Sequence, residues 1–557
     1  IIQAGSYTES LTLNKAISLT GVSSDTVILH AEPNNRVLTV TGAVIDHQVV
    51  ISGLTFTGGN LGTSNSCPDC GGGILITGTA RPLIQSVILD RNKADFGAAI
   101  YSHNNSPLEL SQVKVISNGL YAITAEAPLT ISHSSFSGNS FGVLAYETLS
   151  VNESQFVNDA GIFALAPAAV YKSYFENATI STTAHILVTG SQFISSSYTA
   201  LRANSATVEH SYFAHAYIED YPFRPWQEGG AIYTADALTL THSTVIDNQA
   251  DSGGGVFSVG DIRVVSSYFE GNEGEGIISD KGNILISDTQ IINNIDGFGA
   301  VATLHNPSSP TEVHIIDSLI SGTIDGNGVW IGSPMWITNS QIVYSEGSGV
   351  LAANDVHIAK STIAHNGNSQ YGGLGLYITN GDAYIAESDI SYNGNTDGVG
   401  GLYIQGNVTV DRSTFLGNIM NGFHTDMGGG GGVKSDGYVT VTNSLFQENS
   451  CVNGCYGGSI YAKKGLTISN TEFISNSAEH FGGAAFTHGT AYITNSTFIS
   501  NAAVNGAGGV MYASEAYIAN SRFIANRGLI IPGILMGDGT VLNSLFLNND
   551  VFDIGSE

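Results

Sequence analysis

The residues best suited to bind a ligand lie in one aromatic segment, AHAYIEDYPFRPWQEGG, residues 214–230. Aromatic and arginine side chains are favoured anchors of binding sites, because each offers a large contact area together with a polar or charged group. Flat aromatic rings also suit the faces of sugars. The alternative interpretation is a loop that folds against its own protein and buries these rings. The candidate binding residues are Tyr217, Tyr221, Phe223, Arg224 and Trp226.

A second and weaker candidate is segment 419–432, which contains Phe423, His424 and Asp426. Both segments lead into a glycine cluster, which we interpret below as a corner of the fold. We therefore expect the two segments to project from the same side of the molecule.

The four cysteines form two close pairs, Cys67 with Cys70 and Cys451 with Cys455. A structural zinc site needs about four converging ligands, and these two pairs lie far apart in the sequence. Two local disulfides are therefore favoured over free thiols or a metal site. Disulfides persist in oxidising compartments, so we expect an extracellular or cell-surface location.

The formal net charge of −29 comes from 47 acidic residues against 18 Lys and Arg. Such a chain repels phosphate backbones, which excludes nucleic acid as a partner. Calcium is left open, because carboxylates in adjacent loops could bind it; the alternative is a solvated acidic surface. We predict no required cofactor and assign no metal site. The acidic residues considered for calcium are Asp247, Asp251, Glu270, Glu273 and Glu275.

No apolar run reaches the ~18 residues of a membrane span, and LIIPGILM at 529–536 comes nearest. The chain begins at Ile1 without a starting Met or a signal peptide. We therefore expect a processed or excised piece of a longer precursor. A length of 557 residues exceeds what one compact core supports, which indicates several domains or an elongated, repetitive core.

A repeated motif dominates the chain: an aromatic residue, an asparagine three positions later, then paired glycines, as in GLTISNTEFISNSAEHFGGAAF at 465–486. The apolar residue that begins each repeat is its anchor. Successive anchors from Phe136 onward lie between 18 residues apart, as from Phe175 to Phe193, and 32 residues apart, as from Phe213 to Val245. Mid-chain anchors are Val245, Ile291, Leu319, Ile342, Ile363 and Ile390. The complete Phe-x-x-Asn pairs are Phe136 and Asn139, Phe269 and Asn272, Phe415 and Asn418, Phe446 and Asn449, Phe473 and Asn476, Phe498 and Asn501, Phe523 and Asn526, and Phe546 and Asn549.

Each repeat holds three short β-type runs separated by turn residues, which predicts one coil of a β-solenoid. The predicted fold is all-β: a single right-handed, three-sided parallel β-helix of about 21 to 23 coils, without a barrel domain. It forms one continuous domain over 1–557. Residues 1–50 supply leading coils without the motif, and 51–557 supply coils with it.

Each part of the motif has a physical reason. Inward Phe rings stack between coils and bury large apolar areas. The asparagine closes a corner, since Asn tolerates left-handed backbone geometry and its amide can bond the equivalent Asn of the next coil. The glycine pair marks a second corner, where a Cβ would clash or a positive φ is required.

The pairing of Gly-Gly-Ala-Ile, at 229–232, with Phe-x-x-Asn resembles the repeats of polymorphic outer membrane proteins, which are surface-exposed autotransporter adhesins. The leading AGSYTESLTLNKAISLTG looks like the opening coils of secreted pectin-lyase-like β-helix proteins. The resemblance covers most of the chain. It implies an adhesive or surface-coating role.

Pectin-lyase-like folds often cleave acidic polysaccharides, and such chemistry needs a specific set of acidic and basic residues. NTDG at 395–398 matches the first element of a polygalacturonase-like site, but no paired Asp, His-Gly or Arg-Ile-Lys follows it. Basic residues stand beside acids at Asp411-Arg412, and Lys463-Lys464 is a second basic spot. We assign no catalytic residue.

The main hypothesis is therefore an extracellular structural or adhesive rod that displays corner loops. Its partners would be further copies of itself, joined end to end into a filament, or surface glycans and proteins. The alternative is a polysaccharide-degrading enzyme or a carbohydrate-binding β-helix. A groove where Asp, Glu and Arg of three or more adjacent coils converge would favour the enzyme.

Overall fold

The structure is a computed structural model, and the chain is all-β in it. Among the described residues no helix is long and apolar enough to cross a membrane. The residues that the structure describes are 1–61, 70–159, 161–218, 228–295, 297–304, 311–367, 373–394, 400–421, 429–549 and 554–555.

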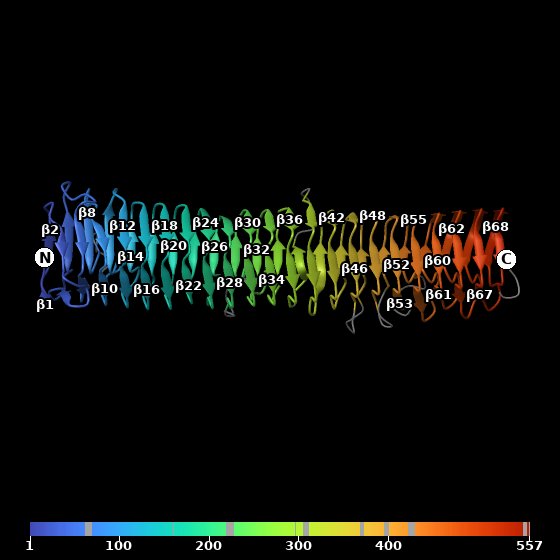
Figure 1. Cartoon of the computed structure of the whole chain (residues 1–557), viewed down its shortest axis with the longest axis horizontal. Helices are drawn as coiled ribbons and strands as arrows, with labels where there is room; N and C mark the ends of the chain where they lie inside the picture. The colour runs from blue at the N-terminus through green and yellow to red at the C-terminus, as the bar shows by residue number, and fades with distance from the viewer. Residues whose placement is uncertain are drawn as a thin grey trace. The chain divides into compact units, whose positions relative to one another are not determined.

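The chain divides into two compact units, unit 1 (residues 1–260) and unit 2 (residues 261–557). Within each unit the strands of successive coils lie side by side and pair in parallel (Figure 1). The predicted parallel β-helix is confirmed for each unit. Its hand, its number of sides and its continuity over 1–557 stay predictions.

One coil of unit 1 shows how the repeat builds this fold. Three short strands follow one another along the chain, and each pairs in register with its counterpart in the next coil. The strands of the first coil are β14 (Ile123–Ala125), β15 (Leu129–Ser132) and β16 (Ser135–Ser137); those of the next are β17 (Val143–Ala145), β18 (Leu149–Asn152) and β19 (Gln155–Val157).

Unit 2 varies this pattern in its last coils. The ten-residue strand β62 (Ala485–Thr494) pairs with β58 (Ile460–Ala462) along its first part and with β59 (Gly465–Ser469) along its second. A further five-stranded parallel sheet lies beside these coils. Its strands are β53 (Ile419–Asn421), β57 (Ser450–Val452), β61 (Ser477–Ala478), β64 (Ala502–Ala503) and β67 (Arg527–Gly528).

The Phe residues of the motif form a stacked interior column in each unit. In unit 1 the rings of Phe136 and Phe156 lie 4.5 Å apart between centroids. In unit 2 the rings of Phe446 and Phe473 lie 5.0 Å apart. The column of unit 2 continues through isoleucines, of which Ile320 is fully buried while Leu319 is only partly buried. The predicted anchor Leu319 is therefore wrong by one residue, because strand alternation turns Ile320 inward.

The asparagines of the motif form a second buried column. The Oδ1 of Asn449 accepts the backbone N–H of Asn418 at 3.1 Å and its side-chain N–H at 2.9 Å, both from the preceding coil. The predicted left-handed geometry of these asparagines is wrong, because the positive φ falls on the residue before them, as at Ser475 (φ 54°) and Ser500 (φ 56°). The asparagine instead points inward, where its amide satisfies buried backbone groups.

The paired glycines occupy the second corner. Gly482 has a φ of 67°, in the left-handed region that disfavours side chains. A Cβ on its neighbour Gly483 would clash with the carbonyl oxygen of Gly509 in the next coil. The glycine pair is therefore required by backbone conformation at one position and by close coil packing at the other.

We expect Asp389→Thr to stabilise unit 2 by about 1 kcal/mol at neutral pH. Asp389 lies in register between Thr362 and Thr414, and its Oδ1 is buried without a hydrogen-bond partner among the described residues. Burial raises the pKa of Asp389 above its usual value of 3.8, while a Ser391 hydrogen bond and the charge of His365 oppose the rise.

The pH dependence of this prediction follows from the raised pKa. A carboxyl group with a raised pKa in the folded state destabilises that state once it ionises. This penalty is therefore absent below pH 3.8 and grows as the pH rises through the pKa of the folded state. Denaturation midpoints of wild type and Asp389→Thr should thus differ most at neutral pH and converge in acid; a difference that grows in acid would contradict the explanation.

Candidate functional site

A pocket forms in unit 2 where the corners of three consecutive coils meet. Each corner leads into one of three paired strands: β38 (Gly299–Thr303), β41 (Asn327–Ile331) and β44 (Val350–Ala352). Because these strands stack in register, corner segments that lie more than 20 residues apart in the sequence (Phe298, Asn327 and Ser348) come side by side.

The pocket has a volume of about 470 Å³, within the range of ~300–1,000 Å³ that is typical of small-molecule sites. Its lining combines aromatic and aliphatic side chains, two carboxylates, amide and hydroxyl groups, and glycine backbone. The lining residues are Gly297, Phe298, Asp325, Gly326, Asn327, Trp330, Glu346, Gly347, Ser348 and Leu351.

Two stacked rings make the apolar part of the pocket. The rings of Phe298 and Trp330 lie 4.6 Å apart between centroids, at an angle of 20°. Phe298 is 47% exposed, and Leu351 lies beside Trp330 in the next coil. This apolar surface suits the C–H faces of a sugar or another flat ligand.

Glycines keep the corner open. Gly297 has a φ of 94°, and a Cβ there would come within 2.5 Å of the Oε1 of Glu275. A Cβ on Gly347 would come within 2.8 Å of the carbonyl oxygen of Gly326. Glycine is therefore required at these positions, because neighbouring protein atoms occupy the space that a Cβ would need.

Hydrogen bonds between coils hold the corner in place. The Asn327 side chain donates to the carbonyl oxygen of Phe298 at 2.8 Å and accepts the backbone N–H of Ser348 at 3.0 Å. Asn327 thereby links all three coils. Beneath the pocket, buried Glu275 accepts the backbone N–H of Phe298 at 3.1 Å. The pocket is therefore framed by fixed groups, which favours a preformed site.

Two acidic residues on adjacent coils line the pocket, and the side chain of one is held against the backbone of the other. The Oε2 of Glu346 accepts the backbone N–H of Asp325 at 3.0 Å. Neither carboxylate forms an ion pair within the part of the chain that the structure describes, and the lining contains no Lys or Arg. Asp325 and Glu346 can thus accept hydrogen bonds from hydroxyl or ammonium groups of a ligand.

The asparagine column is interrupted under the pocket. In two of the three pocket coils, Thr323 and Ser345 take the place of the asparagine, and both hydroxyls are buried without a hydrogen-bond partner among the described residues. Neither side chain can therefore form the bond between two amides that joins coils elsewhere, such as the one from Asn366 to Asn393 at 3.1 Å. The coil of Ser345 is still joined to the next one, because its backbone N–H donates to the Oδ1 of Asn366 at 3.0 Å.

This pocket is not among the predicted sites, although the sequence carries a signal for it. The tetrads DGFG (296–299), DGNG (325–328) and EGSG (346–349) repeat an acid-Gly-x-Gly pattern in three consecutive repeats. The glycine corner was predicted, but the acid before it and the variable residue within it were not considered together. Asp296 lies outside the described residues, and stacking of the coils brings Asp325 and Glu346 into one pocket with Phe298.

The predicted aromatic site lies mostly outside the described residues. Tyr217 is 50% exposed, and its backbone N–H donates to the carbonyl oxygen of Ser196 at 2.8 Å. Tyr221, Phe223, Arg224 and Trp226 lie outside the described part, as do Phe423, His424 and Asp426 and the tetrad 395–398. Binding by either aromatic segment stays a prediction.

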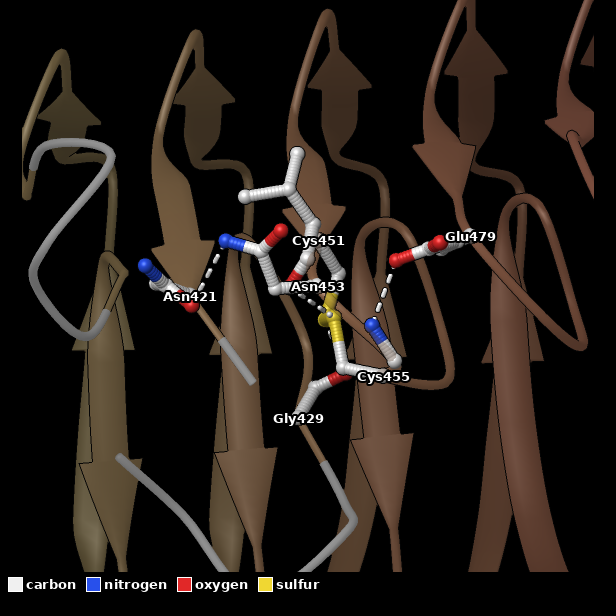
Figure 2. The surroundings of a disulfide bond; sticks show 8 residues. Asn421, Gly429, Cys451, Asn453, Cys455 and Glu479 are labelled. Carbon is white, nitrogen blue, oxygen red and sulfur yellow. Dashed lines mark hydrogen bonds between the residues drawn. A yellow bond between two sulfur atoms is a disulfide. The ribbon is translucent and has the colours of Figure 1, made fainter. Parts of the chain in front are cut away.

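Cysteine placement differs between the two pairs. Cys451 of β57 and Cys455 form a disulfide, beside which the Asn453 side chain donates to Asn421 of the preceding coil at 3.0 Å (Figure 2). Cys70 is buried, and Cys67 lies outside the described residues. The second predicted disulfide stays a prediction.

Two further clusters of charged groups arise from coil stacking. In unit 2, Arg412 contacts Glu387 of the preceding coil at 3.1 Å and Asp411 at 3.0 Å. Hydrogen bonds from Thr442 and Asn443 hold the pKa of Asp411 below its usual value. Since both acids already neutralise this guanidinium, the cluster resembles a structural ion pair more than an unpaired catalytic base.

The second cluster lies in unit 1. The hydroxyl of Tyr101 donates to one oxygen of Glu126 at 2.6 Å, and His103 contacts the other at 2.7 Å. Burial, and then the hydrogen bond to Glu126, raise the pKa of Tyr101 far above its usual value. Both oxygens of Glu126 are therefore engaged within the protein.

The acidic residues considered for calcium are dispersed. Glu275 is buried, while Glu270 accepts the Tyr268 hydroxyl at 2.7 Å. Asp247 lies 3.8 Å from His215. Within the described ranges, no three His, Cys, Asp or Glu side chains come together as metal ligands. Calcium binding stays untested.

Comparisons with known proteins identify no family for this chain. No family model matches it, and no curated protein matches it. Two solved structures show a weak likeness: an alginate lyase of family PL6, AlyGC, and an arginine-to-alanine mutant of it. The mutant aligns at a TM-score of 0.27 and 13% identity, over 100% of this chain and 97% of its own. AlyGC itself aligns at a TM-score of 0.26 and 11% identity, over 99% of this chain and 96% of its own. Likenesses this weak carry no conclusion about activity.

Proposed function

We propose that this protein is an extracellular, carbohydrate-binding β-helix that acts as an adhesive surface element and holds its glycan in the pocket of Phe298 and Trp330. This proposal joins the adhesive hypothesis from the sequence with its carbohydrate-binding alternative. The observation that carries it is the pocket itself. Stacked rings and two carboxylates line a volume of about 470 Å³ there, and neither carboxylate has an ion-pair partner among the residues that the structure describes.

The chemistry of the lining supports a sugar ligand. A sugar offers C–H groups on its faces, which pack on aromatic rings, and hydroxyls at its edge. The hydroxyls can donate to Asp325 and Glu346, because ionised carboxylates only accept hydrogen bonds. A few fixed polar groups around an apolar surface are the usual composition of a ligand site.

Cleavage of acidic polysaccharides gains no support from this pocket. A uronate chain would bring its carboxylates against Asp325 and Glu346, and no lining Lys or Arg would offset their repulsion. The net charge of −29 repels a polyanion at longer range as well. Binding without cleavage is therefore the function that the pocket favours.

The disulfide between Cys451 and Cys455 supports the extracellular location, because disulfides persist in oxidising surroundings. The sequence resemblance to surface-exposed adhesins points in the same direction. End-to-end association of copies stays a prediction, which analytical ultracentrifugation over rising concentration would test.

The test is a binding screen of the full chain against neutral, amino and acidic oligosaccharides, followed by calorimetry. We expect Trp330→Ala and Phe298→Ala each to weaken glycan binding at least about tenfold, since a ring–sugar contact is worth more than ~1.4 kcal/mol at a buried anchor. The matched control is Tyr198→Ala, which removes a ring that is 60% exposed in unit 1.

Three results would count against the proposal. They are no binding to any glycan, equal binding by Trp330→Ala and wild type, or an equal loss in Tyr198→Ala. Because Trp330 is partly buried, thermal unfolding should first establish that each variant is folded. Phe298→Ala, which removes a more exposed ring, keeps the test decisive should Trp330→Ala unfold.

A further inference from the structure

We propose that the pocket of unit 2 selects glycans that carry free, protonated amines over their N-acetylated and acidic counterparts. This inference rests on the proposed function and names the class of its ligand. Three observations carry it: the adjacent carboxylates, the stacked rings and the remaining hydrogen-bonding groups of the pocket.

The first observation is unbalanced negative charge. Asp325 and Glu346 lie on adjacent coils, close enough for a backbone N–H of one to bond the side chain of the other. Like charges at short range repel, and a cation between them relieves that repulsion. Within the described ranges neither acid has a Lys, Arg or His in ion-pair contact, so the ligand is left to supply the positive charge.

The second observation is the aromatic wall beside these acids. The electron-rich face of a tryptophan attracts an ammonium group more strongly than that of any other side chain. The protein uses this contact elsewhere: the Arg202 guanidinium lies 3.7 Å from the ring centroid of Tyr233, and the Lys434 ammonium 4.5 Å from that of Tyr403. One face of Trp330 stacks on Phe298, and the ring lines the same pocket as the two acids. An amine in this pocket can therefore contact an aromatic side chain as well as carboxylates.

The third observation concerns the hydrogen-bonding groups of the pocket that are left to bind the hydroxyls of the sugar. The hydroxyl of Ser348 accepts the backbone N–H of Leu374 at 3.2 Å and keeps its own proton for donation. An N-acetyl group would present an uncharged amide to Asp325 and Glu346, and a uronate would present a third carboxylate. Each loses the charge complementarity that an ammonium gains.

The experiment is calorimetry of the full chain with three probes of equal length: glucosamine, N-acetylglucosamine and galacturonate oligomers. Below the pKa of the amine, we expect the glucosamine oligomer to bind at least about tenfold more tightly than the N-acetyl form. We also expect its affinity to fall with added salt, since exposed charge pairs are screened. The galacturonate oligomer should bind weakest.

Charge-neutral variants locate this preference in the pocket. Asp325→Asn and Glu346→Gln should each weaken binding of the glucosamine oligomer about tenfold, and each should weaken binding of the N-acetyl oligomer clearly less, because that ligand loses a hydroxyl acceptor but no charge pair. The matched control is Glu472→Gln on β60 (Glu472–Ile474), which removes one exposed carboxylate away from the pocket and should leave both affinities unchanged.

The outcomes separate this inference from the proposed function. Equal affinity for the amine and the N-acetyl forms would overturn the inference and leave glycan binding intact. No binding of any oligomer would overturn both. Glucosamine binding that Glu472→Gln weakens as much as Asp325→Asn does would reveal general attraction to an acidic surface, which also overturns the inference.

Discussion

Phe473→Ala is expected to destabilise unit 2 by about 4 kcal/mol. Phe473 is fully buried, and its ring stacks between Phe446 at 5.0 Å and Phe498 at 4.9 Å. Alanine removes the buried area, leaves a cavity and breaks two stacking contacts at once. The neighbouring rings are held by their own coils, so the cavity cannot easily collapse.

Phe473→Ile is the matched control for this prediction. Ile363 and Ile390 occupy the same column in the same unit, the latter directly in register with Phe415. Phe473→Ile should therefore lower the free energy of unfolding by only about 1.5 kcal/mol, because the change nearly conserves side-chain volume. Chemical denaturation of both variants, read together with amide hydrogen exchange in β60, measures the difference. Equal losses for alanine and isoleucine would show that the column is not a close-packed core.

Asn449→Ala is expected to lower the free energy of unfolding of unit 2 by a similar amount, about 3 to 5 kcal/mol, for a different reason. Asn449 is fully buried. Its side chain donates to the carbonyl oxygen of Phe415 at 2.8 Å and to the Oδ1 of Asn476 at 3.1 Å. Its own Oδ1 accepts two N–H groups of Asn418. Alanine leaves several of these buried groups without a partner, and the desolvation of each unsatisfied group destabilises the folded state.

The control for the asparagine column is Asn505→Ala. Asn505 is exposed, and its side chain donates to Glu479 at 3.2 Å, where water can replace the lost bond. We expect the free energy of unfolding of Asn505→Ala to differ from that of wild type by no more than about 0.5 kcal/mol. The measurement is again the denaturation midpoint, with hydrogen exchange of the Asn418 amide as a local probe. Protection of that amide in Asn449→Ala as strong as in wild type would refute the proposed role.

The interior columns and the pocket depend on the same stacking. A column residue inside a unit is buried by the equivalent residues in the coils before and after it, so a strong interior fixes how the coil corners align. The pocket corner of Phe298, Asp325 and Glu346 is one such alignment. It lies where Thr323 and Ser345 interrupt the asparagine column, so its frame depends more on Asn327 than corners elsewhere do.

We therefore expect Asn327→Ala to weaken glycan binding without removing any ring or carboxylate. Asn327 is the only lining side chain described here that bonds the corners on both sides of its own coil. Its loss should impair the alignment of Phe298 with Ser348 and reduce affinity about tenfold. Calorimetry with the oligomer that wild type binds best measures this effect. Unchanged affinity would show that the corner keeps its shape without the amide.

The sequence by itself determined the repeating interior of this protein. The Phe-x-x-Asn pair and the glycine pair are local patterns that recur along the chain. The environment of each of their residues is created by the equivalent residue of the next coil. Periodicity alone therefore predicts which rings stack, although it could not place the left-handed residue beside Asn476 or choose between Leu319 and Ile320. Those choices depend on backbone geometry within a single turn.

Only the tertiary structure decided where a ligand could bind. Corner segments differ in length from coil to coil, so the distance between two of them cannot be counted along the chain. Phe298, Asp325 and Glu346 become neighbours because the strands that follow them pair in register. Each of these residues looks like an ordinary turn residue in the sequence. The pocket arises when stacking adds one exposed side chain from each of three coils.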